Sequence, residues 1–165
     1  MKFLIALSIL IGSLLSGSPA PEESALAGEW GYTGNRFVFT EAEGATPDPG
    51  DVDARLKAMG ASRTGCVLTL TADHKGSLRL GGKSIDFNWA LDRDTKEFNS
   101  MIGPFTIKGW MVRDGKKIVL VYTRTNLFTI IRYLCNSTGR KEVAPLGALL
   151  DRCRGLTLGM EFERN

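Results

Sequence analysis

The feature that most constrains the fold is an alternation of apolar and polar residues between Cys66 and Thr123. A period of two places successive side chains on opposite faces of a β-strand. Short turn segments interrupt the alternation, among them Asp73-His74-Lys75-Gly76 and Asp114-Gly115. This pattern predicts six closely spaced strands joined as a meander, with Gly76 taking a positive φ in its turn.

Two more strands are expected outside the meander. One begins with GEWGY at residues 28–32, and the last contains the alternating residues Leu156, Leu158, Met160 and Phe162. Pairing these two strands would close the sheet and leave no exposed edge. The sequence therefore predicts a mainly β chain, an antiparallel up-and-down barrel of about eight strands with helical insertions.

Three segments have helical periodicity instead. The first covers residues 51–61 and belongs to an arm, residues 34–63, that we expect to cap one end of the barrel. The second covers residues 127–136, with Asn126 as its predicted N-cap. The third covers roughly residues 142–152.

The first 27 residues have the order of a secretory signal peptide. Lys2 precedes an apolar run from Phe3 to Leu15, which is shorter than the roughly 20 residues of a membrane-spanning helix. A buried core helix or an N-terminal anchor is the alternative. Cleavage is expected after Ala20 or Ala27, which leaves residues 28–165 as a single domain that is periplasmic or secreted.

The three cysteines, Cys66, Cys135 and Cys153, allow at most one intramolecular disulfide. If the last two helices are antiparallel, Cys135 and Cys153 lie roughly 15 Å apart, which is too far for a bond. Pairing of Cys66 with either of them stays open. Burial as a small apolar side chain is the expectation for at least one cysteine.

No catalytic or metal-binding pattern is found. His74 is the only histidine and falls in a predicted surface turn, so a nucleophile–histidine arrangement has no suitable base. Asp86 and Asp92 share a strand face but lie near opposite ends of the strand. The formal charge of +3 is not clustered on any element, which argues against nucleic-acid binding. We therefore expect a non-enzymatic protein with no cofactor, metal or nucleic-acid partner.

Several residues carry a resemblance to a known group of proteins. These are Trp30 and Tyr32 in the first strand and Gly155, Gly159 and Phe162 at the end. With the six-strand meander, they resemble the exported lipocalin-like β-barrel domains of uncharacterised function from Gram-negative gut bacteria. The Gly-x-Trp at residues 28–30 is similar to that of lipocalins. There the tryptophan closes the barrel bottom under an arginine of the last strand, which the resemblance implies to be Arg154 or Arg164 here.

The resemblance implies a possible small hydrophobic ligand in the barrel, because an eight-stranded barrel can hold one small ligand. The alternative is an envelope protein-protein interaction module whose barrel core is filled and whose helical insertion binds a partner protein. Aromatic and aliphatic residues on inward faces are the candidate lining: Trp30, Phe87, Trp89, Phe105, Leu120 and Tyr122.

Overall fold

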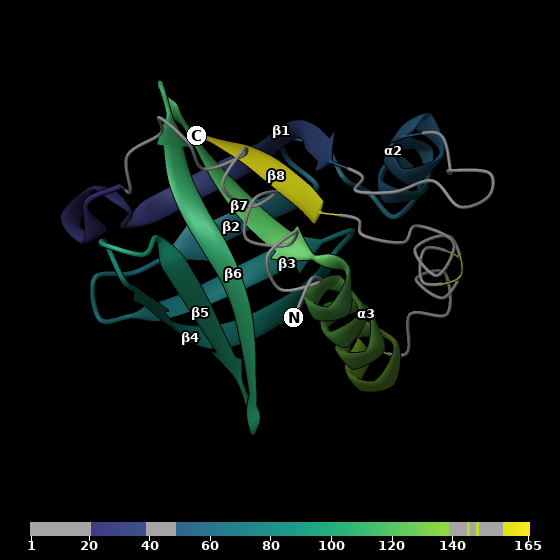
Figure 1. The fold of residues 1–165 in the computed structure, drawn as a ribbon. Coiled ribbons are helices and arrows are strands. Elements are labelled where there is room, and N and C mark those ends of the chain that lie inside the picture. The colour runs from purple at the N-terminus through teal and green to yellow at the C-terminus, as the bar shows by residue number, and fades with distance from the viewer. Residues whose placement is uncertain (1–20, 39–48, 139–144, 146–147, 149–156) are drawn as a thin grey trace, which may run out of the picture.

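The computed structural model describes residues 21–38, 49–138, 145, 148 and 157–165. Strands make up most of this part of the chain (Figure 1). Its elements are η1 (Glu23–Ala25), β1 (Gly28–Val38), α2 (Pro49–Ala58), β2 (Cys66–Leu70), β3 (Lys75–Leu80), β4 (Lys83–Leu91), β5 (Glu97–Ile102), β6 (Phe105–Asp114), β7 (Lys117–Thr123), α3 (Arg124–Thr138) and β8 (Thr157–Arg164).

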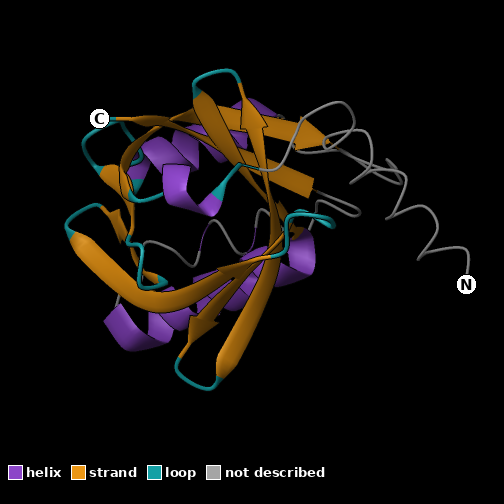
Figure 2. Ribbon diagram, turned by 90° about the vertical axis from the view of Figure 1, so that its left-hand side faces the viewer, coloured by secondary structure: helices purple, strands orange, loops and turns teal. Residues whose placement is uncertain are grey.

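The strands form a closed antiparallel barrel in which each strand pairs with the next one in the sequence. β8 completes the ring by pairing with both β7 and β1. Figure 2 shows the strands curving around a common interior. The predicted fold, an up-and-down barrel closed by its first and last strands, is confirmed.

The two ends of the barrel are covered differently. β1 and β7 run in the same direction, and α2 and α3 follow them, so both helices lie at the same end. In Figure 1 these helices are on the right, whereas η1 is the purple coil on the left. We call the end with α2 and α3 the helical end and the other the closed end.

The closed end is sealed around Trp30. Its indole Nε1 donates a hydrogen bond of 2.9 Å to the carbonyl oxygen of Leu26, whose side chain is fully buried. The guanidinium of Arg164 lies 4.7 Å from the centre of the Trp30 ring and also donates to the carbonyl of Ala25. Of the two arginines left open by the sequence, Arg164 therefore covers the tryptophan.

The turn between β2 and β3 differs from the prediction. His74, not Gly76, takes the positive φ, at 61°. Gly76 lies within β3, where a Cβ atom would come within 2.5 Å of the Phe87 ring. Glycine is therefore needed at position 76 for packing rather than for turn geometry.

The first strand is longer than expected. β1 continues to Val38, so residues 34–38 pair with β8 and do not belong to the capping arm. The register shifts between Tyr32 and Gly34, which indicates a β-bulge at Thr33. The alternation seen in the sequence breaks at this bulge, and this break concealed the second half of the strand.

The helix after β7 also begins earlier than predicted, at Arg124. The Thr123 hydroxyl accepts the Asn126 backbone N–H at 3.5 Å, so Thr123 is the N-cap residue. Asn126 instead donates through Nδ2 to the carbonyl of Lys108 in β6, which ties α3 to the barrel. The predicted helix at 142–152 falls almost wholly outside the described residues.

Cys66 is a free thiol with a fully buried side chain. Burial raises the pKa of the thiol to about 12. The expected burial of a cysteine is confirmed for Cys66, which forms no disulfide. The side chains of Cys135 and Cys153 lie outside the described residues.

Within the described residues, every helix is too short or too polar to cross a lipid bilayer.

Candidate ligand-binding cavity

A cavity of about 90 Å³ lies inside the barrel near the helical end. We call it the inner cavity. Residues of α2, α3 and strands β2 to β8 form its wall, and Ser100 and Tyr122 are the ones with a side-chain hydroxyl. The lining is Leu56, Met59, Leu68, Leu78, Leu80, Ile85, Phe87, Ser100, Ile102, Ile107, Leu120, Tyr122, Leu127, Ile130, Leu158, Met160 and Phe162.

The two hydroxyl groups in the wall are partners in one hydrogen bond. Ser100 on β5 and Tyr122 on β7 share a side-chain hydrogen bond, and both residues are buried. Burial raises the pKa of Tyr122 to about 12, because the phenolate would be poorly solvated there, and the hydrogen bond with Ser100 offsets part of this rise. Since the polar atoms are paired, the cavity presents an essentially apolar surface.

Packing against glycine positions the Tyr122 ring. A Cβ atom at Gly109 on β6 would come within 2.6 Å of Cε1 of Tyr122. Gly109 therefore lets the ring lie flat against the neighbouring strand, where a larger residue would push it into the cavity.

Two helices cover the helical end of the cavity. Asn35 on β1 holds α2 in place by donating a hydrogen bond of 2.7 Å to the carboxylate of Asp53. This places Leu56 and Met59 against the barrel, with 5% and 3% of their surface exposed. Both side chains face the barrel interior, Leu56 from α2 and Met59 from the turn that follows it.

The six residues proposed as a lining from the sequence do not lie together. Phe87, Leu120 and Tyr122 are in the wall of the inner cavity. Trp30 lies at the closed end under Arg164, outside this cavity.

Trp89 and Phe105 also lie outside the cavity, at opposite ends of the barrel. The Trp89 ring packs between His74, 4.7 Å away, and Phe98, 6.0 Å away. Phe105 is 53% exposed because it is the first residue of β6, next to the tight β5–β6 turn that projects beyond the barrel wall. Strand alternation gives the face of a residue correctly but does not give its height along the barrel.

Sequence reasoning missed the contributions of the helices and of β8. Leu56, Met59, Leu127 and Ile130 line the cavity, as does Met160 of β8. The helical residues were recognisable as apolar faces by their spacing of three and four residues. The sequence does not tell which end of the barrel these helix faces cover, because that depends on the direction of the strands before the helices.

A second pocket, of about 480 Å³, lies on the outer surface of the barrel over β2 to β5. We call it the outer pocket. Most of its side chains are polar and point away from the barrel interior. Its lining is Thr69, Thr71, Lys75, Gly76, Ser77, Asp86, Phe87, Asn88, Met101 and Gly103. Phe87 is the residue that the inner cavity and the outer pocket have in common.

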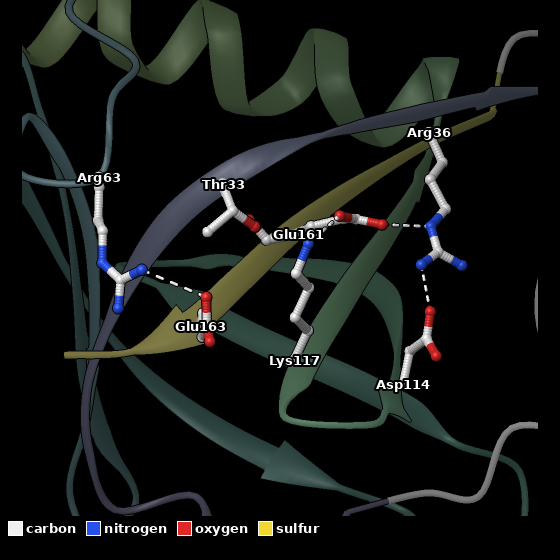
Figure 3. Close-up of polar contacts among 7 residues, drawn as sticks. All are labelled: Thr33, Arg36, Arg63, Asp114, Lys117, Glu161 and Glu163. Atoms are coloured by element: carbon white, nitrogen blue, oxygen red, sulfur yellow. Dashed lines mark hydrogen bonds and ion pairs between the residues drawn. The ribbon is translucent and has the colours of Figure 1, made fainter.

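A cluster of charged residues lies on a different part of the outer surface, across the seam between β1 and β8 (Figure 3). Arg36 of β1 forms ion pairs with Asp114 and Glu161, and Lys117 of β7 binds Glu161 at 3.1 Å. Burial alone would raise the pKa of Glu161, but hydrogen bonds from Arg36 and Lys117 outweigh it and lower the pKa. Each of these charges has a partner of opposite sign, so the cluster serves barrel closure.

No group of three histidine, cysteine or acidic side chains lies close enough to hold a metal ion among the residues that the structure describes. His74 is at the closed end, where its Nδ1 lies 3.2 Å from the Trp89 carbonyl oxygen and its Nε2 lies 3.8 Å from Glu23. The histidine is thus remote from the inner cavity, at the opposite end of the barrel.

Fold and cavity together define this chain as a closed eight-stranded antiparallel barrel with a small apolar interior. No family model and no curated protein matches it. Among solved structures, the chain is similar to a DUF4847 family protein from Bacteroides vulgatus ATCC 8482, a gut bacterium. The two are 13% identical with a TM-score of 0.43, over 85% of this chain and 94% of that chain.

Proposed function

We propose that this protein binds a small apolar ligand in the inner cavity and catalyses no reaction. The observation that carries the proposal is the apolar wall of that cavity, in which the two hydroxyl groups are already paired. Binding sites for small molecules are typically concave and apolar, with few polar groups. The barrel itself is compatible with many functions, so the wall chemistry is the better guide.

The size of the cavity indicates the kind of ligand. An apolar cavity of roughly 150 Å³ in another protein binds benzene or xenon. At about 90 Å³ the inner cavity is smaller, which favours a slim aliphatic chain over a ring system. The flexible side chains of Met59 and Met160 can adjust to a chain somewhat longer than the present volume.

We further propose that the protein is exported and acts in the periplasm or outside the cell. The apolar run from Phe3 to Leu15 after Lys2 supports this location. A carrier of apolar molecules is useful there, because such molecules are poorly soluble in the aqueous phase between or outside membranes.

Titration with straight-chain alcohols from butanol to octanol tests the proposed function. We expect NMR shift changes at cavity residues such as Leu120 and Ile107, with affinity rising along the series until the cavity is full. Ile130→Phe on α3 should weaken 1-hexanol binding at least fivefold by filling the cavity. Arg132→Phe, on the exposed side of the same helix, is the matched control and should leave binding unchanged.

Absence of any shift at cavity residues across the whole alcohol series would contradict the proposal. The same holds if Ile130→Phe binds hexanol as well as the parent protein does. In either case the alternative function, a protein-interaction module with a filled core, becomes the better explanation.

A further inference from the structure

We infer that the ligand is an amphiphile, whose chain occupies the inner cavity and whose uncharged, hydroxyl-bearing head group lies in the outer pocket. This inference rests on the proposed function and adds the class of ligand and its route through the barrel wall. Three features carry it: the pairing of β4 with β5, the position of Phe87, and the polar groups of the outer pocket.

The barrel wall is incompletely paired between β4 and β5. β4 spans Lys83–Leu91, but its residue pairs with β5 run only from Asn88 to Leu91. On its other side β4 pairs with β3 from Lys83 onward. Along residues 83–87 the strand therefore has a partner in β3 but none in β5. β1 along residues 32–38 and β6 along residues 105–109 are also paired on one side, but the gap beside β4 is the one that adjoins the outer pocket, so we place the entry of the chain here.

Phe87 stands at this gap between the two pockets. It immediately precedes Asn88, the first residue of β4 that pairs with β5, and belongs to the lining of both pockets. Its ring rests on Gly76, where even a methyl group would come within 2.5 Å of the ring. Across the gap, Ile102 lines the inner cavity while Met101 and Gly103 line the outer pocket, so the β5 side divides in the same way.

The outer pocket has the chemistry of a site for a neutral polar group. Thr69, Thr71 and Ser77 present hydroxyl groups, and Asn88 presents an amide. Lys75 is the basic residue of the pocket and forms an ion pair of 3.1 Å with Asp73, which competes with any anionic ligand for it.

Asp86 adds one negative charge to the pocket. Because hydroxyl and amide groups predominate and the lysine is already paired, the pocket favours hydrogen bonding to hydroxyl groups over binding of an anion. A sugar-like head group fits this chemistry, whereas a carboxylate would face Asp86 without a free cation among the residues of the lining.

Comparison of three probes with one chain length tests the inference. 1-Hexanol measures the chain alone, n-hexyl glucoside adds a neutral polyhydroxyl head, and hexanoate adds a charge. By calorimetry or NMR titration, hexyl glucoside should bind about tenfold more tightly than hexanol, the gain expected from one or two net hydrogen bonds. Hexanoate should bind no more tightly than hexanol.

Two exposed positions on the outer face of β4 locate the head group. Asn88→Leu should abolish the advantage of hexyl glucoside and leave hexanol binding unchanged. Ser84 lies four residues away on the same face but outside the pocket. Ser84→Leu should therefore change neither the advantage of hexyl glucoside nor the binding of hexanol. Phe87→Ala should speed both association and dissociation of hexyl glucoside at least fivefold, measured by NMR line shapes.

The outcomes separate the inference from the proposed function. Hexanol binding without a gain for hexyl glucoside would overturn the amphiphile and leave the apolar site intact. A gain that survives Asn88→Leu, or exchange rates unchanged by Phe87→Ala, would show that the head group or the route lies elsewhere. If neither probe binds, both proposals fail.

Discussion

Tyr122 is a titratable residue in the apolar interior of the barrel. Its hydroxyl is buried beside Ser100, and burial raises its pKa to about 12 from the ordinary value of 10. A group whose pKa is raised on folding contributes stability that is complete below the pKa of the unfolded chain. That stability is lost as the pH rises toward the pKa of the folded protein.

We therefore expect the free energy of unfolding to fall between pH 10 and pH 12, and Tyr122→Phe to reduce this fall by about 2 kcal/mol. Burial also raises the pKa of Tyr32, so part of the pH dependence remains in the Tyr122→Phe variant. Urea denaturation at a series of pH values measures the effect. Tyr133→Phe on α3 is the control and should retain the dependence of the parent; an identical slope in Tyr122→Phe would contradict the assignment.

Single residues also show what the sequence can and cannot determine. The alternation in β4 placed Phe87, Trp89 and Leu91 inward correctly, because a period of two fixes the face of each side chain. It could not tell that Trp89 belongs to the closed end and Phe87 to the cavity wall. Height along a barrel depends on the register of several strands, which no single strand encodes.

At the scale of elements, the segment before β1 is part of the barrel structure. Leu26 is fully buried, its carbonyl accepts the Trp30 indole, and Arg164 binds the carbonyl of Ala25. Glu22 and Glu23 also lie near basic partners, at 3.7 Å from Arg93 and 3.8 Å from His74. Of the two expected cleavage positions, the one after Ala20 keeps these contacts, and the one after Ala27 removes them.

A chain beginning at Gly28 should therefore be less stable than one beginning at Pro21, by about 2–4 kcal/mol. The estimate combines burial of one leucine side chain with the loss of a buried hydrogen bond. Urea denaturation of the two chains measures it. Replacing Glu22 and Glu23 by alanine in the longer chain is the control and should cost little, because both of these side-chain contacts are exposed. Equal stability of the two chains would contradict this role.

The ends of helices and strands were predictable only where a single sequence pattern, such as alternation or one capping residue, marks them. The strands from β2 to β7 follow from alternation and turn residues, and the structure has them in the expected order. The predicted first strand ended too early because a bulge at Thr33 shifts the alternation of β1. The start of α3 was misplaced because Thr123 and Asn126 are both good caps, and Asn126 is engaged with β6 instead.

For the whole molecule, stability depends on the seam between the first and last strands. Arg36, Glu161 and Lys117 bridge β1, β8 and β7, and the Glu161 side chain is 13% exposed. The pKa of Glu161 is lowered on folding, so its contribution is present above the ordinary value of 4.5 and is lost as the pH falls below it.

We expect Glu161→Gln to lower the free energy of unfolding by about 1 kcal/mol at pH 7 and to bring little change at pH 3. Chemical denaturation at both pH values tests this expectation. Glu29→Gln is the control, an exposed carboxylate on β1 that lies outside the cluster. A Glu161→Gln penalty that persists undiminished at pH 3 would point to packing rather than to charge.

The closed barrel was predictable because the first and last strands both have apolar alternation, and their pairing covers both edges of the sheet. The interior was harder to foresee. Whether large side chains such as Phe87 and Tyr122 fill a barrel depends on how each rests on its neighbours, here on Gly76 and Gly109. These glycines are ordinary strand residues in the sequence, and only the assembled sheet reveals that they make room for rings.

The pairing of β8 with both β7 and β1 has a consequence for the order of folding. All other strand pairs join neighbours in the sequence and can form before the ring is complete. The ring itself must wait for its last eight-residue strand. Until then the nascent sheet has two open edges, at β1 and at β7, and is vulnerable to pairing with other chains. A chaperone that protects these edges should therefore bind the chain before β8 is in place and release it once the ring has closed.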